Sequence, residues 1–251
     1  MSVARSLTLP TFRRHARPLW LRFRRPTLTF WTLFFANLLF VALRGLADDT
    51  PVPHQRASVL DVERLFGGGR TPTERLQGWF YSGHAGPVEW FFVGVHTSWY
   101  LVPVAMTLYI LLIHKPRSQR YAVMWTGVFF VSLVPFFLVP TEPPWMALGG
   151  AHRIAEIVRG VPVNADTNPL AAFPSLHIAV PAAQAFWLRS ERMNRWALVF
   201  SVYTALVAFA VVYLGEHYVV DVLAGVLLAY GVVRIYLRAP AWLAPETAAD
   251  R

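Results

Sequence analysis

Residues 196–237 read WALVFSVYTALVAFAVVYLGEHYVVDVLAGVLLAYGVVRIYL. The stretch contains two apolar runs, Trp196–Leu214 and Tyr218–Leu237, which are separated only by residues 215–217. A helix needs about 20 residues to cross the roughly 30 Å hydrocarbon core of a bilayer. Each run therefore predicts one membrane-spanning helix, and the pair predicts a tight turn with ionisable side chains between two spans.

The same length criterion finds four further apolar runs. They are Thr27–Leu46, Glu89–Ile113, Tyr121–Val139 and Phe173–Leu188, the last being shorter and expected to be tilted or partly buried. Hydrophobic residues make up 55% of the chain and charged residues 15%, and the mean hydropathy is +0.41. An average soluble protein is about a quarter charged, and disordered chains have low hydrophobicity. We therefore predict an all-α, polytopic membrane protein with six transmembrane helices. The first run could instead be a signal peptide, although it exceeds the usual hydrophobic core of about 7–15 residues.

The charged residues predict the orientation of these spans. The connections on the side of the N-terminus hold 16 Lys and Arg residues against 3 Asp and Glu, whereas those on the other side hold 7 against 11. Positive charge collects on the cytoplasmic side of membrane proteins. We expect both termini to be cytoplasmic, with a basic arm at 1–26, a membrane domain at 27–238 and a short tail at 239–251. Topology thus explains the net charge of +9 without a nucleic-acid partner.

Two polar motifs are predicted at the extracytoplasmic surface. In HYVVD, His217 and Asp221 are four residues apart, so the carboxylate can accept the Nδ1 proton and leave Nε2 as a nucleophile or base. In FPSLH, Pro174 is expected in the first turn of a helix, followed by Ser175 and His177. A helix N-terminus with a serine is an anion site that suits phosphate. Ionisable groups in spans cost about 2.5–3.5 kcal/mol, so we interpret both motifs as functional.

Four other basic residues are candidates for binding an anion, and each has a structural alternative. His96 lies about two turns into the second predicted span, where a lone histidine is commonly a hydrogen-bonded structural residue. His152, Arg153 and Arg159 follow the third span, and the arginines could simply meet lipid headgroups. The long outer connections are also expected to contain short helices near 58–66 and 151–159.

These motifs resemble a known family. FPSLH, followed 40 residues later by HYVVD, is similar to the second and third signature motifs of the type 2 phosphatidic acid phosphatase superfamily. PTEPPW at 140–145 and YLGEHYVVDVLAG at 213–225 resemble the branch that includes inositol phosphorylceramide synthases and their bacterial relatives. The resemblance extends over residues 90–237, approximately, and implies a six-helix membrane fold with its site at the extracytoplasmic surface.

The resemblance also implies phosphoryl transfer through a phosphohistidine, with no metal ion or other cofactor. Carried over, His217 is the nucleophile, Asp221 orients it, and His177 protonates the leaving oxygen. Ser175 takes the position whose hydroxyl and neighbouring amides hold phosphate. The sequence departs from the phosphatase branch because its one lysine, Lys115, lies in a predicted cytoplasmic loop.

A second departure is Val211, which stands where that branch has an arginine. Other groups must then balance the phosphate charge, and His96, His152, Arg153 and Arg159 are the candidates.

The sequence thus predicts a lipid phosphatase or phosphotransferase that acts on a phosphate-bearing lipid in the plasma membrane, with its site facing outwards. Water as acceptor would make it a phosphatase, and an alcohol such as inositol would make it a transferase. Two other classes stay open. One is a membrane enzyme acting on a prenyl diphosphate, and the other is a non-catalytic transporter or scaffold.

Overall fold

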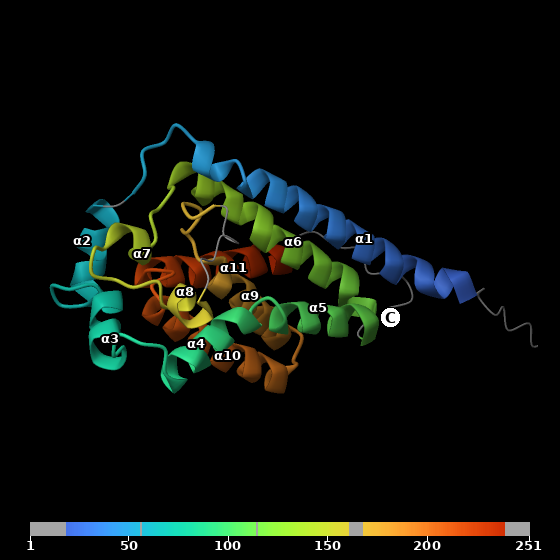
Figure 1. Cartoon of the computed structure of the whole chain (residues 1–251). Coiled ribbons are helices and arrows are strands. Elements are labelled where there is room, and N and C mark those ends of the chain that lie inside the picture. The colour runs from blue at the N-terminus through green and yellow to red at the C-terminus, as the bar shows by residue number, and fades with distance from the viewer. Residues whose placement is uncertain (1–18, 56, 114, 161–167, 239–251) are drawn as a thin grey trace, which may run out of the picture.

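The computed structural model describes residues 19–55, 57–113, 115–160 and 168–238, and within these ranges it contains helices but no named strand (Figure 1). The first 18 residues of the predicted arm and the whole predicted tail lie outside this part of the chain. The α-helices are α1 (Leu19–Arg44), α2 (Ala57–Phe66), α3 (Pro72–Phe80), α4 (Pro87–Ser98), α5 (Val102–Ile113), α6 (Lys115–Leu138), α7 (Pro144–Ala147), α8 (Ile154–Arg159), α9 (Leu176–Ser190), α10 (Asn194–Tyr213) and α11 (Val219–Arg238). A 3₁₀ turn, η1 (Ala47–Asp49), follows α1.

Five segments are long and apolar enough to cross a membrane. They are Phe30–Asp49, Pro87–Ile113, Arg120–Leu138, Asn194–Tyr213 and Val219–Arg238. Each overlaps a predicted span, so the prediction of an all-α polytopic chain is confirmed for the described residues. The number of six spans and the side of each terminus stay predictions.

The remaining predicted span, Phe173–Leu188, forms α9, which has only 15 residues. At 1.5 Å per residue it extends about 22 Å, less than a bilayer core. Almost all of α9 is buried, and it packs against α10 and α11 along its length. Four of its buried residues, Ala179, Ala182, Ala183 and Ala185, are small enough to let the neighbouring helices approach closely. The helix is therefore the centre of the bundle.

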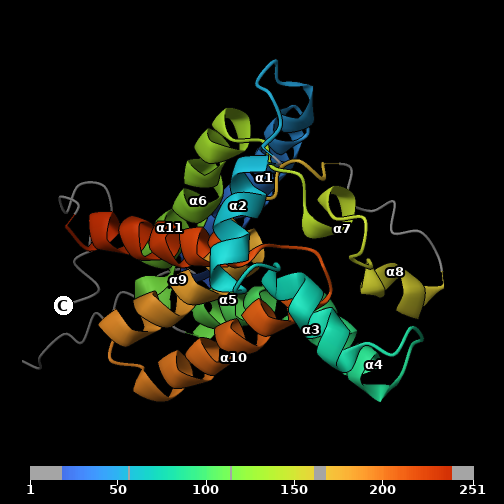
Figure 2. The same ribbon diagram turned by 90° about the vertical axis from the view of Figure 1, so that its left-hand side faces the viewer.

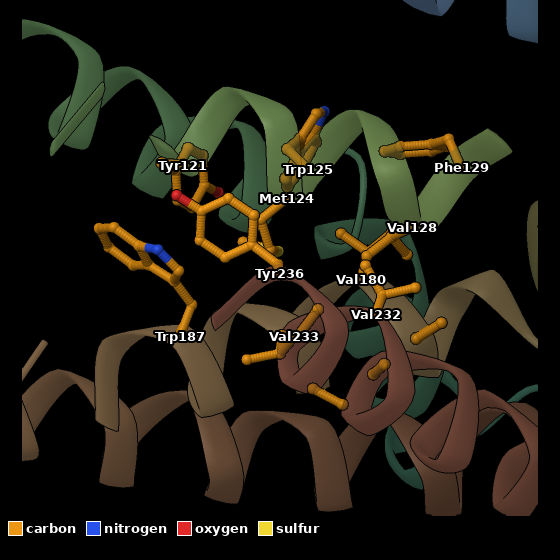
Figure 3. Close-up of a cluster of buried hydrophobic side chains, with 14 of the residues drawn as sticks. Tyr121, Met124, Trp125, Val128, Phe129, Val180, Trp187, Val232, Val233 and Tyr236 are labelled. Atoms are coloured by element: carbon orange, nitrogen blue, oxygen red, sulfur yellow. The ribbon is translucent and has the colours of Figure 1, made fainter. Parts of the chain in front are cut away.

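Apolar and polar contacts together fix α9 against α5 and α6. Figure 3 shows the apolar part, in which aromatic rings of α6 face Trp187 of α9 and Tyr236 of α11. The polar contacts come from buried Gln184, whose Nε2 donates to the Tyr121 hydroxyl (2.7 Å) and to the Pro103 carbonyl (2.9 Å). Polar side chains that bond across helices hold membrane bundles in one register.

The second predicted span, Glu89–Ile113, is two helices rather than one. α4 ends at Ser98 and α5 begins at Val102, with Trp99 and the two residues after it in turns. Pro103 has no N–H to donate to the Trp99 carbonyl, which ends the regular helical bonding there. The break places the C-terminal turn of α4, with His96, beside the N-terminus of α9.

The short helices α2, α3, α7 and α8 gather at one end of the bundle (Figures 1 and 2). The predicted helix at 58–66 is confirmed as α2, and α8 lies within the predicted 151–159. α3 was not predicted from the sequence, although it begins with a capping box between Thr71 and Glu74 and has Pro72 in its first turn. Isolated bridges from Thr141 to Gln55 and Ala171 join the outer connections at this end.

Candidate functional site

The site forms where the N-termini of α9 and α11 meet. The Ser175 N–H donates to the Asp221 carbonyl (3.1 Å), which ties the two helix starts together. The placement of Pro174 was predicted wrongly: it lies before α9, which begins at Leu176 with Ser175 at its N-cap. A side chain on Gly225 would place its Cβ 2.6 Å from the Ser175 carbonyl oxygen. Glycine at this position therefore allows the close crossing of α9 and α11.

His217 and Asp221 form a bonded pair at the start of α11. His217 lies just before the helix, and its Nδ1 is 3.3 Å from Asp221 Oδ2. The same oxygen accepts the Tyr218 N–H at 2.9 Å, and the Asp221 side chain is completely buried. The turn between α10 and α11 depends on Gly215, whose φ of +80° favours glycine and whose Cβ would lie 2.8 Å from the His152 carbonyl. With Nδ1 directed at the carboxylate, His217 directs Nε2 away from it.

Two further histidines, each from another part of the chain, continue from this pair. His217 Nε2 is 3.1 Å from His177 Nδ1, and His177 Nε2 is 3.2 Å from His96 Nε2. The Trp99 ring packs beside His177, with the ring centroids 4.8 Å apart. The result is a continuous line of polar contacts from a buried carboxylate through His217 and His177 to His96.

Ser175 lies at the same helix start but is fully buried. Its Oγ has no hydrogen-bond partner among the described residues. Its carbonyl accepts the N–H of Ile178 (3.2 Å) and Ala179 (2.9 Å) in the first turn of α9. The Ser175 hydroxyl is therefore a buried polar group without a partner in the described part of the chain, two residues before His177.

Arg153 and Arg159 differ in their surroundings. Arg153 contacts Glu216 at 3.1 Å and Glu156 at 2.9 Å, and its guanidinium lies 4.3 Å from the centre of the Trp145 ring. Burial alone would lower the pKa of Arg153, but the two carboxylates outweigh it and raise the pKa. Arg159 donates to the Thr97 hydroxyl (2.7 Å), one residue beyond His96.

His152 is a predicted site residue whose ring lies outside the line of histidines. Its side chain is exposed, and its ring packs against Tyr81 at 5.2 Å between ring centres. Its backbone N–H and carbonyl are both bonded to the side-chain amide of Gln77. The structure does not bring its ring to the other three histidines.

A cavity of about 380 Å³ opens beside His177 and His217. Its polar end also includes Glu216 and Arg44, and its other walls are mainly aromatic and aliphatic. These walls are Phe40, Val41, Trp99, Tyr100, Pro103, Val104, Trp125, Phe129, Trp145, Leu176 and Val180. A polar end with the histidines and a long apolar wall fit an amphiphile with an anionic headgroup.

Two residues near the site were missed by the sequence reasoning. Arg44, in the last turn of α1, is not among the candidate residues that the sequence motifs indicate. Glu63 of α2 is completely buried, and its Oε1 accepts the Val220 N–H (2.7 Å) in the first turn of α11. Burial raises the pKa of Glu63, although backbone hydrogen bonds from α11 oppose the shift. The amphipathic pattern of α2 predicts the helix but not that one of its acidic residues caps another helix.

Among the described residues, no group of three or more His, Asp or Glu side chains could hold a metal ion.

Comparison with known families bears directly on this arrangement. Residues 58–235 match the PAP2 superfamily, and they include every element that forms the histidine line. The chain belongs to the PAP2 superfamily. The resemblance predicted from FPSLH and HYVVD is thereby confirmed, and the membership together with the five apolar helices makes this an integral membrane protein.

A relative within reach of sequence comparison is named phosphoinositol dihydroceramide synthase, from Bacteroides thetaiotaomicron. It is 27% identical over 188 residues, which cover 62% of this chain and 61% of the relative. The chain thus spans less than two thirds of that protein's length. No solved structure matches the chain. The name of the relative agrees with the inositol phosphorylceramide synthase-like branch of the PAP2 superfamily.

Proposed function

We propose that this PAP2 protein is a lipid phosphatase or phosphotransferase that works through a phosphohistidine on His217. The observation that supports the proposal most strongly is the line Asp221–His217–His177 beside a cavity with an apolar wall. A carboxylate on Nδ1 fixes the tautomer in which Nε2 has a lone pair, and a second histidine lies within proton-transfer distance.

In the first half-reaction, His217 Nε2 attacks the phosphorus of the lipid in line with the leaving oxygen. The nitrogen–phosphorus bond forms as the phosphorus–oxygen bond breaks, and His177 gives its proton to the leaving oxygen. Because the two ring nitrogens are only 3.1 Å apart, the rings must move apart to admit a phosphoryl group between them. Asp221 stabilises the positive charge that develops on His217.

In the second half-reaction, an acceptor hydroxyl loses its proton to His177 and attacks the phosphorus. The nitrogen–phosphorus bond then breaks and restores His217. Water as acceptor gives hydrolysis and an alcohol gives transfer. The relative is named for making a phosphoinositol dihydroceramide, a molecule whose name joins a phosphate-linked inositol to a lipid, and this supports an alcohol acceptor.

Phosphate binding is proposed to begin at the N-terminus of α9. The unpartnered Ser175 hydroxyl lies there with the positive end of the helix dipole. His96 supports His177 from the opposite side. Of the predicted basic residues near this rim, Arg159 lies beside His96 through its bond to the Thr97 hydroxyl. Arg153 is paired with Glu156 and Glu216, and the His152 ring packs on Tyr81.

We also propose the membrane, and the side of it, at which the protein acts. The bias of basic residues supports a topology with both termini in the cytoplasm and the histidines at the outer face of the plasma membrane. An acceptor and a lipid headgroup would then both reach the cavity from the extracytoplasmic side.

The proposal is tested by trapping the intermediate. Purified protein in detergent is incubated with ³²P-labelled lipid phosphates, with and without inositol, and products are identified by mass spectrometry. We expect acid-labile, alkali-stable label on the wild type and none on His217→Ala. Asp221→Asn should lower turnover by about 10²–10⁴-fold, with an unchanged thermal unfolding midpoint. His54→Ala is the matched control, since His54 is an exposed histidine outside the site.

Two results would contradict the proposal. Label retained in His217→Ala would refute the nucleophile. Reaction in ¹⁸O water with the isotope entering the alcohol rather than the phosphate would show carbon–oxygen cleavage, as expected of a prenyl diphosphate enzyme. A wild type that neither turns over nor becomes labelled would support a transporter or scaffold instead.

A further inference from the structure

α1 lies outside the residues that match the PAP2 superfamily, yet it forms one wall of the cavity. The family match begins at residue 58, and α1 ends at Arg44. Four residues of α1 line the cavity, at the spacing i, i+3, i+4 and i+7 that defines one helix face. They are Asn37, Phe40, Val41 and Arg44.

Packing against α6 sets the rotation of α1 that aims this face inwards. Phe40 is almost fully buried and meets Phe129 edge-to-face, with ring centroids 5.0 Å apart. Leu33, two turns earlier on the same side, is also buried, whereas Phe35 and Leu39 are exposed on the opposite side. Rotating α1 to move Arg44 out of the cavity would expose Phe40, so the packing energy of this ring fixes the position of the arginine.

The guanidinium end of the Arg44 side chain is also held in place. One of its terminal nitrogens donates to the Asn168 carbonyl (3.3 Å), in the segment that leads to Ser175 and α9. Arg44 shares the cavity with His177 and His217, and its charge is close enough to act on the His177 ring. The guanidinium is thereby held near the reacting nitrogens by both α1 and the loop before α9.

Arg153 and Arg44 differ in their place relative to the cavity. Arg153 is bonded to both Glu156 and Glu216 and is not among the residues that line the cavity. Glu216 itself lines the cavity and would repel a phosphate. A transferring phosphoryl group is stabilised mainly by positioning and by positive charge. Within the described cavity lining, Arg44 is the arginine on the wall.

We infer that Arg44 binds the phosphate group of the lipid substrate, and that α1 completes the substrate site. A guanidinium can bind two phosphate oxygens at once, which would orient the phosphorus towards His217 Nε2. The apolar positions Phe40 and Val41 would then lie beside the lipid chains. This inference rests on the proposed function, because it assumes a phosphate at the histidines.

The test measures phosphate affinity separately from turnover. Arg44→Gln and Arg44→Lys are prepared as full-length protein in detergent, with Arg189→Gln as the matched control. Arg189 is an exposed arginine in the last turn of α9, and its Nη1 donates to the side chain of Asn194. Inorganic phosphate is used as a competitive inhibitor, and orthovanadate binding is followed through the fluorescence of the tryptophans that line the cavity. Thermal unfolding is recorded for every variant.

We expect Arg44→Gln to weaken phosphate and vanadate binding by about tenfold or more, as loss of a charge-assisted pair predicts. The KM for the lipid phosphate should rise in parallel. Arg44→Lys keeps the charge but not the two-pronged geometry, so its affinity should fall by a smaller factor. Arg189→Gln should match the wild type.

Unchanged phosphate affinity in a folded Arg44→Gln would overturn the inference and leave Arg44 as a structural or headgroup-anchoring residue. If Arg44→Gln does not fold, Arg44→Lys decides, and wild-type affinity in that variant would equally overturn it. Failure of the proposed function gives a different result. The wild type itself would then show neither turnover nor a labelled histidine, whatever the Arg44 variants do.

Discussion

At the scale of single residues, the site depends on how each imidazole is held. His217 is held by a buried carboxylate at 3.3 Å, whereas His177 is held by His217 on one side and His96 on the other. A histidine pair shares one proton between two nitrogens, so the tautomer of His177 depends on what His96 offers it. We therefore propose that His96 is a positioning residue for the proposed acid.

A pair of His96 variants tests this role. An asparagine amide can still offer a donor or acceptor towards His177, whereas an alanine methyl cannot. We expect His96→Ala to lower kcat by about tenfold or more and His96→Asn to lower it less, consistent with the loss of a supporting hydrogen bond to a site histidine. Steady-state assays across pH 5–9 should also show a changed acid or base limb for His96→Ala. Equal rates and pH profiles in both variants and the wild type would contradict the role.

Glu63 predicts a pH dependence of stability. Burial raises its pKa above the ordinary value, so the folded protein binds the proton more tightly than the unfolded chain does. The stabilisation is then fully present below the unfolded pKa of about 4.5 and is lost as pH rises through the raised value. We expect Glu63→Gln to flatten this slope in thermal unfolding measured from pH 4 to 8. An unchanged slope would show that Glu63 does not titrate in this range.

At the scale of elements, the sequence predicts the contacts between the site residues better than the helix boundaries. The four-residue spacing of His217 and Asp221 is sufficient to predict their contact, and the motif around His177 predicts its position at a helix start. The break between α4 and α5 was not predicted, because Pro103 lies within a long run that is mainly apolar on both sides of it. Inside a membrane, lipid-facing and protein-facing sides are both apolar, so periodicity gives no warning.

The crossing of α9 and α11 gives an element-scale prediction. An added Cβ at residue 225 would lie 2.6 Å from the Ser175 carbonyl and 3.2 Å from the Ile178 Cβ, so the helices must separate. Overpacking of this kind costs about 1–3 kcal/mol. We expect Gly225→Ala to lower the unfolding midpoint and to lower activity strongly by moving His177 away from His217. Gly231→Ala is the control, since its added Cβ would meet nothing within 4 Å. Wild-type behaviour in both would contradict the close crossing.

At the scale of the whole molecule, the cavity is a joint product of helices far apart in the chain. Trp125 of α6, Val180 of α9 and Arg44 of α1 all line it. No local pattern relates Arg44 to His177, because their proximity depends on how α1 packs on α6. This is why the histidines and Asp221 could be proposed from the sequence while Arg44 could not.

The proposed topology is testable because the chain contains no cysteine. Single cysteines can therefore be placed at exposed Ser82, before α4, and at exposed Ser190, the last residue of α9. We expect a membrane-impermeant maleimide to label Ser82→Cys in intact cells. Ser190→Cys should react only after permeabilisation. The opposite pattern would place the histidines on the cytoplasmic side.

The shortness and burial of α9 have a consequence for biogenesis. A long apolar helix can partition into lipid alone as it leaves the ribosome, but a 15-residue segment rich in alanine gains too little from lipid contact to stay there. We therefore expect the stable insertion of α9 to require packing against α10 and α11, which are synthesised later. A chain truncated before α11 would leave α9 without one of the two helices that bury it. We expect cellular quality control to degrade such a fragment.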